Sequence, residues 1–285
     1  MTDIFRFNGT GFDQIPGSLR QISAGKADAV WGVNDDAQLF RFNTASGVFD
    51  RVPVSADIAS VSVGQTGEAW MLTTDLEIIR LNPTSGSLEG IPGELRQIAA
   101  ASGGFAWGLD RDSNVFLLEN AISKQIPGTL QIISTGPTGN AWGLSANSGI
   151  FFSDSETSQL QPIPGNLSSI SVGEFFPLDN RVQVWGLNPR PQPPGSLIQE
   201  HDIFQLVRHP DGTPNGALEF LPVPGELMVI AAAAEDVWGI NAFHNVFRWN
   251  PQSRIFDPIP GQQLDALSVG NETVWGLSNP VTPPR

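Results

Sequence analysis

Residues that could bind a metal or carry out catalysis are few in this sequence. Its 285 residues include three histidines and no cysteine, which excludes a disulfide framework, a thiolate metal site and a catalytic cysteine. His201 and His209 could supply two metal ligands, but no third ligand accompanies them. The acidic pair Asp110-x-Asp112 favours a turn over a calcium loop, because it is not part of a dense D-x-D-x-D-G motif. We therefore predict no metal site and no cofactor.

The motifs of common hydrolases and nucleotide-dependent enzymes are also missing. The sequence has no Gly-x-Ser-x-Gly, no His-Glu-x-x-His, no phosphate-binding loop, and no Gly-x-Gly-x-x-Gly between a strand and a helix. Carboxylate pairs arise by chance among 29 acidic residues, so a glycosidase stays open as an alternative. The sequence favours a protein that is not an enzyme.

The excess of acidic residues limits the classes of partner that the chain can be expected to bind. Aspartate and glutamate outnumber lysine and arginine 29 to 15, and the formal charge of −14 argues against nucleic acid and anionic membrane surfaces. No run of about 18 apolar residues is present, so we expect no membrane insertion. Residues 1–7 have neither a basic nor an apolar leader segment. We expect a cytoplasmic protein that is released on damage or by a route without a signal peptide. The sequence does not indicate an oligomeric state.

Tryptophan recurs along the chain at a regular spacing. Seven tryptophans lie 35 to 53 residues apart, and six of them are followed by glycine: Trp31, Trp70, Trp107, Trp142, Trp185, Trp238 and Trp275. The ten residues after Trp275 and the first 31 residues make one further interval of 41. An interval of one repeat across the chain ends is what a closed ring requires.

Each repeat contains four short runs of strand composition. The first run, as in Leu19 to Gly25, precedes the tryptophan, a third run such as Gln38 to Phe42 follows it, and a Pro-Gly segment marks the fourth. Helical periodicity is absent, so we predict an all-β fold, a single seven-bladed β-propeller domain of four-stranded antiparallel blades. The predicted blades are residues 19–54, 58–91, 95–126, 130–163, 167–223 with insertions, 227–259, and 264–285 together with 1–17.

Residue types also assign the strands within a blade. The fifth position of the first run is always serine or alanine, so we expect this run to be the crowded innermost strand: Ser23, Ser62, Ala99, Ser134, Ser171, Ala231 and Ser268. Each tryptophan then lies on the second strand and fills the wedge between blades, and the glycine after it leaves room for the neighbouring blade's backbone. The chain starts in a third strand and ends after a second one. N-terminal strands should therefore complete the last blade and close the ring.

The segments Ile-Pro-Gly, Leu-x-x-Ile-Ser-x-Gly, Val-Trp-Gly-x-Asn and Ile-Phe-Arg together resemble the tectonin repeat over residues 1–279. This family includes lectins of fungi and slime moulds, horseshoe-crab lectins of the tachylectin type that recognise bacterial lipopolysaccharide, and fungal defence lectins that bind O-methylated glycans. The resemblance implies a multivalent lectin of innate defence whose partners are glycans on cell surfaces or glycoconjugates. Because tectonin repeats also occur in intracellular scaffolds, the alternative is a protein–protein interaction scaffold without sugar binding.

Candidate ligand residues follow from this resemblance, because sugar pockets combine an aromatic face with hydrogen-bonding side chains. The repeat offers tryptophan, asparagine at the end of the second strand and arginine on the third strand. The candidates are Trp31, Asn34, Arg41, Arg80, Asn241, Arg248 and Arg6. The alternative is that tryptophan is core, asparagine stabilises a turn and arginine faces solvent. Leucine, phenylalanine or glutamine replaces the arginine in repeats 3 to 5, so those blades should lack such a site.

Two loop residues that break the repeat are further candidates. Phe243 and His244 lie in the turn between the second and third strands of repeat 6. An exposed loop aromatic either binds a ligand or packs under its own loop. Repeat 5 carries two insertions, Pro189 to Gly195 and His209 to Gly216, and the scaffold alternative would place its partner there.

Overall fold

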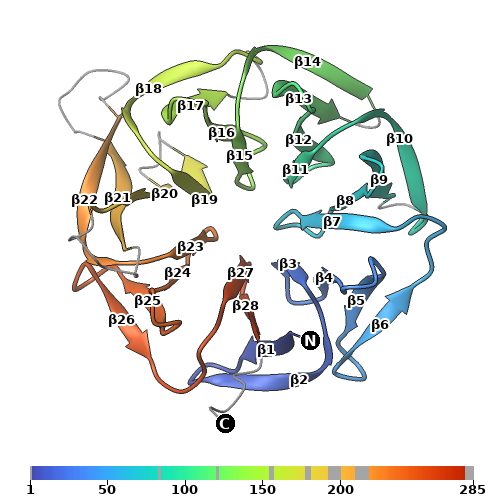
Figure 1. Ribbon diagram of the computed structural model, residues 1–285, viewed down its shortest axis with the longest axis horizontal. Helices are drawn as coiled ribbons and strands as arrows, with labels where there is room; N and C mark the ends of the chain where they lie inside the picture. Colours follow the sequence, from blue (N-terminus) through green and yellow to red (C-terminus); the bar gives the residue numbers. More distant parts are fainter. Residues whose placement is uncertain are drawn as a thin grey trace.

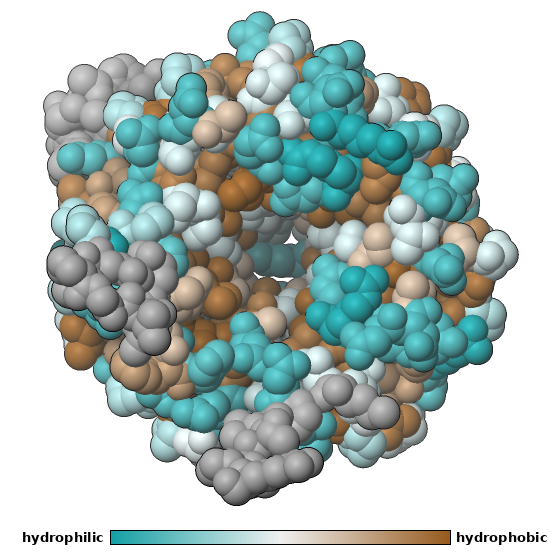
Figure 2. Space-filling model, in the orientation of Figure 1, coloured by the Kyte–Doolittle hydropathy of each residue, from teal (hydrophilic) through white to brown (hydrophobic). Residues whose placement is uncertain are grey.

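The computed structural model describes residues 2–82, 85–119, 122–153, 157–176, 181–191, 200–208 and 218–279. These residues form seven four-stranded antiparallel sheets, arranged as blades around a central axis (Figure 1). The prediction of an all-β, seven-bladed propeller is confirmed. Figure 2 shows an opening at the centre of the ring, with hydrophilic and hydrophobic residues interspersed on this face. The described part of the chain contains no helix long and apolar enough to cross a membrane.

The first strand of each blade lies nearest the axis and the fourth lies at the rim (Figure 1). The innermost strands are β3 (Gln21–Lys26), β7 (Ile58–Val63), β11 (Gln97–Ala100), β15 (Ile132–Thr135), β19 (Ser169–Phe176), β23 (Val229–Ala232) and β27 (Ala266–Gly270). The second strands are β4 (Ala29–Val33), β8 (Ala69–Thr73), β12 (Phe105–Leu109), β16 (Ala141–Leu144), β20 (Arg181–Pro189), β24 (Val237–Ile240) and β28 (Thr273–Ser278).

The outer half of each blade completes the meander. The third strands are β5 (Leu39–Asn43), β9 (Glu77–Leu81), β13 (Asn114–Glu119), β17 (Gly149–Ser153), β21 (His201–Arg208), β25 (Val246–Asn250) and β1 (Asp3–Phe7). The rim strands are β6 (Val48–Val52), β10 (Leu88–Glu94), β14 (Ile122–Thr129), β18 (Gln161–Asn166), β22 (Leu218–Glu226), β26 (Ile255–Ile259) and β2 (Phe12–Ser18). We number the blades 1 to 6 from β3 to β26, and blade 7 contains β27, β28, β1 and β2.

The two ends of the chain close the ring within blade 7. β1 pairs with β28 in antiparallel register, with Ile4 opposite Leu277 and Arg6 opposite Trp275. Ile4 is fully buried, so this pairing contributes both backbone hydrogen bonds and core packing. The predicted closure by N-terminal strands is confirmed, and it gives blade 7 the same four strands as the other blades.

The repeat tryptophans fill the wedges between blades, as predicted. Trp31 of blade 1 packs in one cluster with Ile58, Val61 and Met71 of blade 2, and a similar cluster forms at each of the other interfaces. None of the seven is more than 2% exposed. Burying a tryptophan removes about 150–250 Å² from water, worth about 4–6 kcal/mol as an upper bound.

The expectation for the glycine after each tryptophan is wrong. A Cβ on Gly32 would lie 2.4 Å from a methyl group of Leu19, which belongs to the same blade and not to its neighbour. The glycines that let neighbouring blades approach lie instead at the end of the innermost strands. A Cβ on Gly25 would lie 2.0 Å from the backbone oxygen of Gly64 in the next blade.

The serines of the innermost strands do more than save space. Ser62 Oγ accepts a hydrogen bond of 2.9 Å from the N–H of Ala100 on the next blade, and Ser23 Oγ accepts one of 3.0 Å from Val63. The same bond occurs from blade 5 to blade 6 and from blade 7 to blade 1. These bonds link blades whose inner strands are not paired with each other.

Replacing Ser62 by alanine should destabilise the fold by about 1–3 kcal/mol, because the buried N–H of Ala100 would lose its acceptor. Urea unfolding of the Ser62→Ala protein measures this cost. Ser123→Ala is the matched control, since that serine is exposed on rim strand β14. An equal effect of both substitutions would contradict the role of the inner serines.

Removing residues 1–18 should lower the cooperativity and the midpoint of thermal unfolding, because β28 would lose one of its two partner strands and blade 7 would lose half of its strands. Calorimetry checks this against a control that lacks residues 281–285, which follow the end of β28. Unchanged unfolding after the N-terminal deletion would refute closure by β1 and β2.

Candidate functional site

Phe243 occupies a position where the sister turns of the propeller carry short polar residues. In five turns between second and third strands, one non-glycine residue has a positive φ of 57–71°. The residue before it is Asp36, Asp75, Asp112 or Asn147 in four of these turns and Phe243 in the fifth. The Phe243 side chain is 54% exposed. The turn itself does not need this aromatic ring, since the sister turns form without one.

The turn that carries Phe243 is held by several hydrogen bonds. Asn241 Oδ1 accepts bonds of 3.0 Å from the N–H groups of Phe243 and Asn245. His244 has a φ of 63°, and its Nδ1 lies 2.8 Å from a carboxylate oxygen of Asp265 in the next blade. The predicted site residues Asn241 and His244 therefore fix the backbone that presents the ring of Phe243.

A groove between blades 5 and 6 lies beside this ring. We call it the Phe243 groove, with a volume of about 420 Å³ and a lining of Glu200, Ile203, Pro224, Gly225, Glu226, Leu227, Asn241, Ala242, Phe243, Phe247, Ile255 and Phe256. Two carboxylates, from Glu200 and Glu226, contribute to a lining that is otherwise mostly apolar. Arg190 forms ion pairs with Glu226 and Asp202 and so orients the carboxylate of Glu226.

An equivalent groove between blades 2 and 3 shows what the fold builds without the aromatic residue. It has a volume of about 360 Å³, and Glu94, Asp110 and Phe116 stand there in the places of Glu226, Asn241 and Phe247. At the position of Phe243 it has Asp112. The groove is thus a product of the repeat, whereas an aromatic residue at the position of Phe243 distinguishes blade 6 among the five turns compared above.

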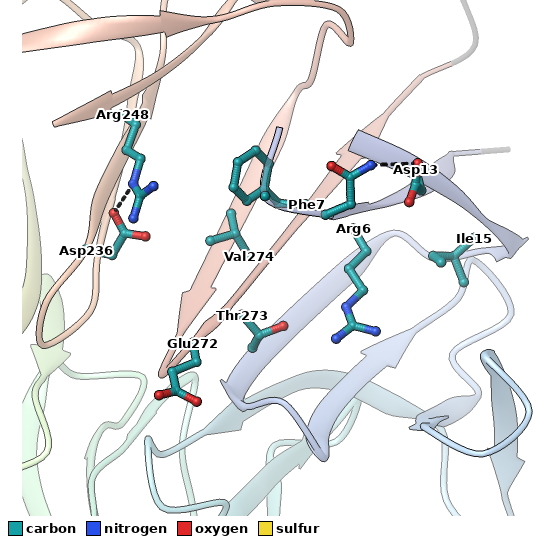
Figure 3. Close-up of a pocket in the computed structure, with 11 residues that line it drawn as sticks. Arg6, Phe7, Asp13, Ile15, Asp236, Arg248, Glu272, Thr273 and Val274 are labelled. Carbon is teal, nitrogen blue, oxygen red and sulfur yellow. Dashed lines mark hydrogen bonds and ion pairs between the residues drawn. The ribbon is translucent and has the colours of Figure 1, made fainter. Parts of the chain in front are cut away.

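Arg6 and Arg248 both line a second groove, which lies between blades 6 and 7 (Figure 3). We call it the clasp groove, with a volume of about 640 Å³ and a lining of Arg6, Phe7, Asn8, Gly9, Asp13, Ile15, Asp236, Arg248, Glu272, Thr273 and Val274. Arg248 Nε donates to Asp236 at 2.8 Å, and Asn8 Nδ2 donates to Asp13 at 2.9 Å. Figure 3 shows the paired Arg248 and Asp236 on one side, Arg6 on the other, and Phe7 and Val274 between them.

The other predicted residues lie outside both grooves. Trp31 is buried in the wedge between blades 1 and 2, and its ring is not available at the surface. Arg41 lies opposite it on the neighbouring strand and stacks over the ring, with 5.3 Å from Cζ to the centroid. Asn34 Oδ1 accepts a bond of 2.9 Å from the N–H of Gln38 and stabilises a turn.

Arg80 repeats the stacking geometry in blade 2. Its Cζ lies 5.8 Å from the ring centroid of Trp70, and its guanidinium forms an ion pair with Glu89 on the adjacent strand. The hydrogen bond from Arg80, supported by one from Asn82, lowers the pKa of the Glu89 carboxyl. The four arginines of this column thus share a contact that covers a tryptophan, and Arg6 and Arg248 also line the clasp groove.

The histidines do not assemble a metal site within the described residues. His201 lies at the start of β21, where burial lowers its pKa, and His209 and the insertion that it begins lie outside the described residues. No cluster of three histidine, aspartate or glutamate side chains suited to a metal occurs in the described ranges.

Sequence reasoning missed the carboxylates of the Phe243 groove. Glu226 follows a Pro-Gly segment, as Glu94 does in blade 2, and this recurrence was the available signal. Glu200 carries no such signal, because the first insertion of repeat 5 separates it from the preceding strand. Residues 192–199 of that region lie outside the described residues.

Comparison with known proteins adds a family and a fold. The sequence model of the tectonin domain matches three overlapping segments, residues 1–82, 44–192 and 95–280. No curated protein matches the chain.

Among solved structures, yeast RCC1 (Prp20) bound to Kap60 is similar, with a TM-score of 0.72 and 10% identity over 99% of this chain and 90% of that one. Virginiamycin B lyase from Staphylococcus aureus has a TM-score of 0.62 and 14% identity over 98% and 100%. Human WBSCR16 has a TM-score of 0.64 and 11% identity over 97% and 98%. At these identities the likeness shows the propeller fold alone.

The Arg80–Glu89 pair should make stability depend on pH in acid. Because the folded-state pKa of Glu89 is lowered, its stabilisation is complete above about pH 4.5 and is lost as the pH falls through the lowered value. Glu89→Gln should therefore be less stable than the wild type near neutral pH, and the two should converge in acid. Urea unfolding over this range tests it, with Glu119→Gln, an exposed glutamate on β13, as the control. A difference that persists in acid would contradict this role.

Proposed function

The chain belongs to the tectonin family, and from this membership and the geometry of the Phe243 groove we propose that it is a lectin. The observation that carries the proposal is the exposed ring of Phe243 on a turn that its sisters build with aspartate or asparagine. An aromatic ring held beside a groove provides a flat apolar wall on which the C–H face of a sugar ring can stack.

The polar groups of the groove complement the hydroxyls of a sugar. Glu226 and Glu200 offer carboxylate oxygens as acceptors at the rim. Asn241 uses its side-chain oxygen within the turn, and its NH₂ group has no acceptor among the described residues, so it can donate to a ligand. Few polar groups around an apolar floor are typical of small-molecule sites.

The apolar lining favours a sugar that carries an apolar substituent. Hydrocarbon surface in the groove comes from Phe247, Phe256 and Ile255. A free sugar hydroxyl placed against this surface would lose hydrogen bonds to water without gaining others. An O-methyl group removes one hydroxyl donor and adds a methyl group that such a surface can bury. We therefore place O-methylated glycans ahead of bacterial lipopolysaccharide as the ligand class.

Binding at one shallow groove of this size is expected to be weak, and simultaneous binding at several sites would raise the overall affinity. A millimolar site supplies about −4 kcal/mol, and simultaneous engagement of two sites can raise the overall affinity by about 10²–10⁴-fold. The equivalent groove at blades 2 and 3 is a second contact point on the same face of the ring. A multivalent lectin stored in the cytoplasm and released on damage is the defence role that fits this design.

Phe243→Ala should weaken glycan binding about tenfold or more, equivalent to about 1.4 kcal/mol, because it removes the stacking wall. The measurement is a glycan array with O-methylated glycans, their unmethylated parents and lipopolysaccharide cores, followed by titration of the best ligand. Thermal unfolding should change little, since the side chain is exposed.

Asp112→Ala is the matched control, because Asp112 holds the same position in the groove of blades 2 and 3. It should leave intact the affinity of a monovalent glycan for the Phe243 groove, because Asp112 lies in the other groove. Equal binding by wild type and Phe243→Ala would overturn the site, and a wild-type array without any bound glycan would overturn the lectin function in favour of a protein–protein scaffold.

A further inference from the structure

An asparagine stands at or directly after the end of the third strand in blades 1, 2, 6 and 7. Its side-chain oxygen accepts hydrogen bonds from backbone N–H groups of the turn that follows. Its NH₂ group donates to a carboxylate on the rim strand of the same blade. The pairs are Asn43 with Asp50, Asn82 with Glu89, Asn250 with Asp257 and, in blade 7, Asn8 with Asp13.

The residue after this asparagine differs among the four blades. It is Thr44 in blade 1, Pro83 in blade 2, Pro251 in blade 6 and Gly9 in blade 7. An asparagine amide is lost spontaneously when the next backbone nitrogen attacks the amide carbon. A side chain on the next residue hinders this attack, and a proline has no N–H to give up. Gly9 therefore leaves Asn8 open to a reaction that the sister turns obstruct.

The turn of blade 7 also leaves the reacting groups accessible. Asn8 and Gly9 are both exposed, and a Cβ placed on Gly9 would have no atom within 4 Å. The N–H of Gly9 makes no hydrogen bond with any residue that the structure describes. The asparagine and its carboxylate are five residues apart here and seven in blade 1, and in the shorter turn Gly9 has a φ of 105°, which favours glycine. The fold of this turn thus requires the residue that makes the amide reactive.

Hydrogen-bond donors surround the oxygen on which the attack would place negative charge. Asn8 Oδ1 accepts bonds of 3.0 Å from the N–H groups of Thr10 and Gly11 and one of 3.1 Å from the Thr10 hydroxyl. As the nitrogen of Gly9 bonds to Cγ, charge moves to this oxygen, and donors already in place stabilise it. The corresponding oxygen of Asn43 accepts bonds of 2.9 and 3.3 Å from backbone N–H groups and lacks a hydroxyl donor among the described residues.

We propose that Asn8 is a site of spontaneous deamidation in the folded protein, with Gly9 as the attacking residue. Hydroxide removes the proton of the Gly9 N–H, the nitrogen forms a bond to Asn8 Cγ, and the bond from Cγ to Nδ2 breaks. Nδ2 leaves as ammonia with a proton from water, which regenerates hydroxide. Water then opens the cyclic imide at either carbonyl and gives aspartate or isoaspartate. The net change is uptake of water and loss of ammonia, with no oxidation or reduction.

The product alters the hairpin that closes the ring. Asn8 Nδ2 donates to Asp13 at 2.9 Å (Figure 3), whereas a carboxylate in its place can only accept, so two like charges would face each other. Isoaspartate also adds a methylene group to the backbone of the turn between β1 and β2. Because β1 pairs with β28, deamidation should weaken the closure of blade 7 as the protein ages. The reaction requires no ligand, so it is independent of glycan binding.

Peptide mapping by mass spectrometry, on the full chain incubated at physiological temperature, tests the site. Asn8 should convert at least about tenfold faster than the sister asparagines of blades 1, 2 and 6, and faster at higher pH because hydroxide takes part. The other Asn-Gly pair, Asn215-Gly216, lies outside the described residues and is followed separately in the same map. Conversion of Asn8 no faster than that of Asn43 would overturn the proposal.

Two variants examine the causes of reactivity. Thr44→Gly places a glycine after Asn43 and should make that amide convert faster than in the wild type, and an unchanged rate would contradict the role of the glycine. Thr10→Ala removes one donor to Asn8 Oδ1 and should slow the conversion of Asn8 severalfold. An unchanged rate in Thr10→Ala would overturn the contribution of the turn.

The effect on closure has its own test. Asn8→Asp reproduces the charge of the product and should lower the midpoint of thermal unfolding by about 2 °C. It should also quicken hydrogen exchange in β28 (Thr273–Ser278), the strand that β1 holds. The double variant Asn8→Asp with Asp13→Asn exchanges donor and acceptor and should recover most of both effects. An Asn8→Asp protein with the midpoint and β28 exchange of the wild type would refute the link between deamidation and ring closure.

Discussion

Filling the wedge between neighbouring blades is the constraint on which the rest of this structure depends. Flat sheets that radiate from an axis diverge toward the rim, and the gap must hold apolar side chains rather than water. Tryptophan on each second strand fills that gap, as Trp31 does between blades 1 and 2. Two further positions of the repeat are constrained around the tryptophan. The leucine before the inner strand packs on the glycine that follows the tryptophan, and the glycines at the ends of the inner strands allow the blades to approach closely.

The periodic part of this design was readable in the sequence, whereas the nonperiodic part was not. The tryptophan spacing predicted seven blades, and the order of the runs at the two chain ends predicted the pairing of β1 with β28. The glycine after each tryptophan was misassigned, since spacing alone does not say whether Leu19 or a neighbouring backbone lies against Gly32. A residue conserved among the repeats for a contact within its blade has the same spacing as one required for a contact between blades.

The same limit applies to the candidate site. Arg41 and Arg80 belong to a column that the fold uses to cover tryptophan, and a regular column cannot reveal which of its members also borders a groove. Phe243 was identifiable because it departs from the column, where its sisters are aspartate or asparagine. Glu200 was not, because the first insertion of repeat 5 separates it from the preceding strand and interrupts the repeat there. Ligand recognition in this propeller is therefore proposed where one blade differs from the others, on a frame that all seven share.

Closure through blade 7 has a consequence for the order in which the protein is made. β1 and β2 are synthesised before the other strands of the propeller, yet the strand that must pair with β1 is β28, the last of them. Until then the hairpin exposes an edge, and Phe5 and Ile4, both buried in the final fold, lack most of their partners. The most non-local contact of the ring is also the last that can form. Blades 1 to 6 can assemble as the chain emerges, and the finished ring appears only at the end.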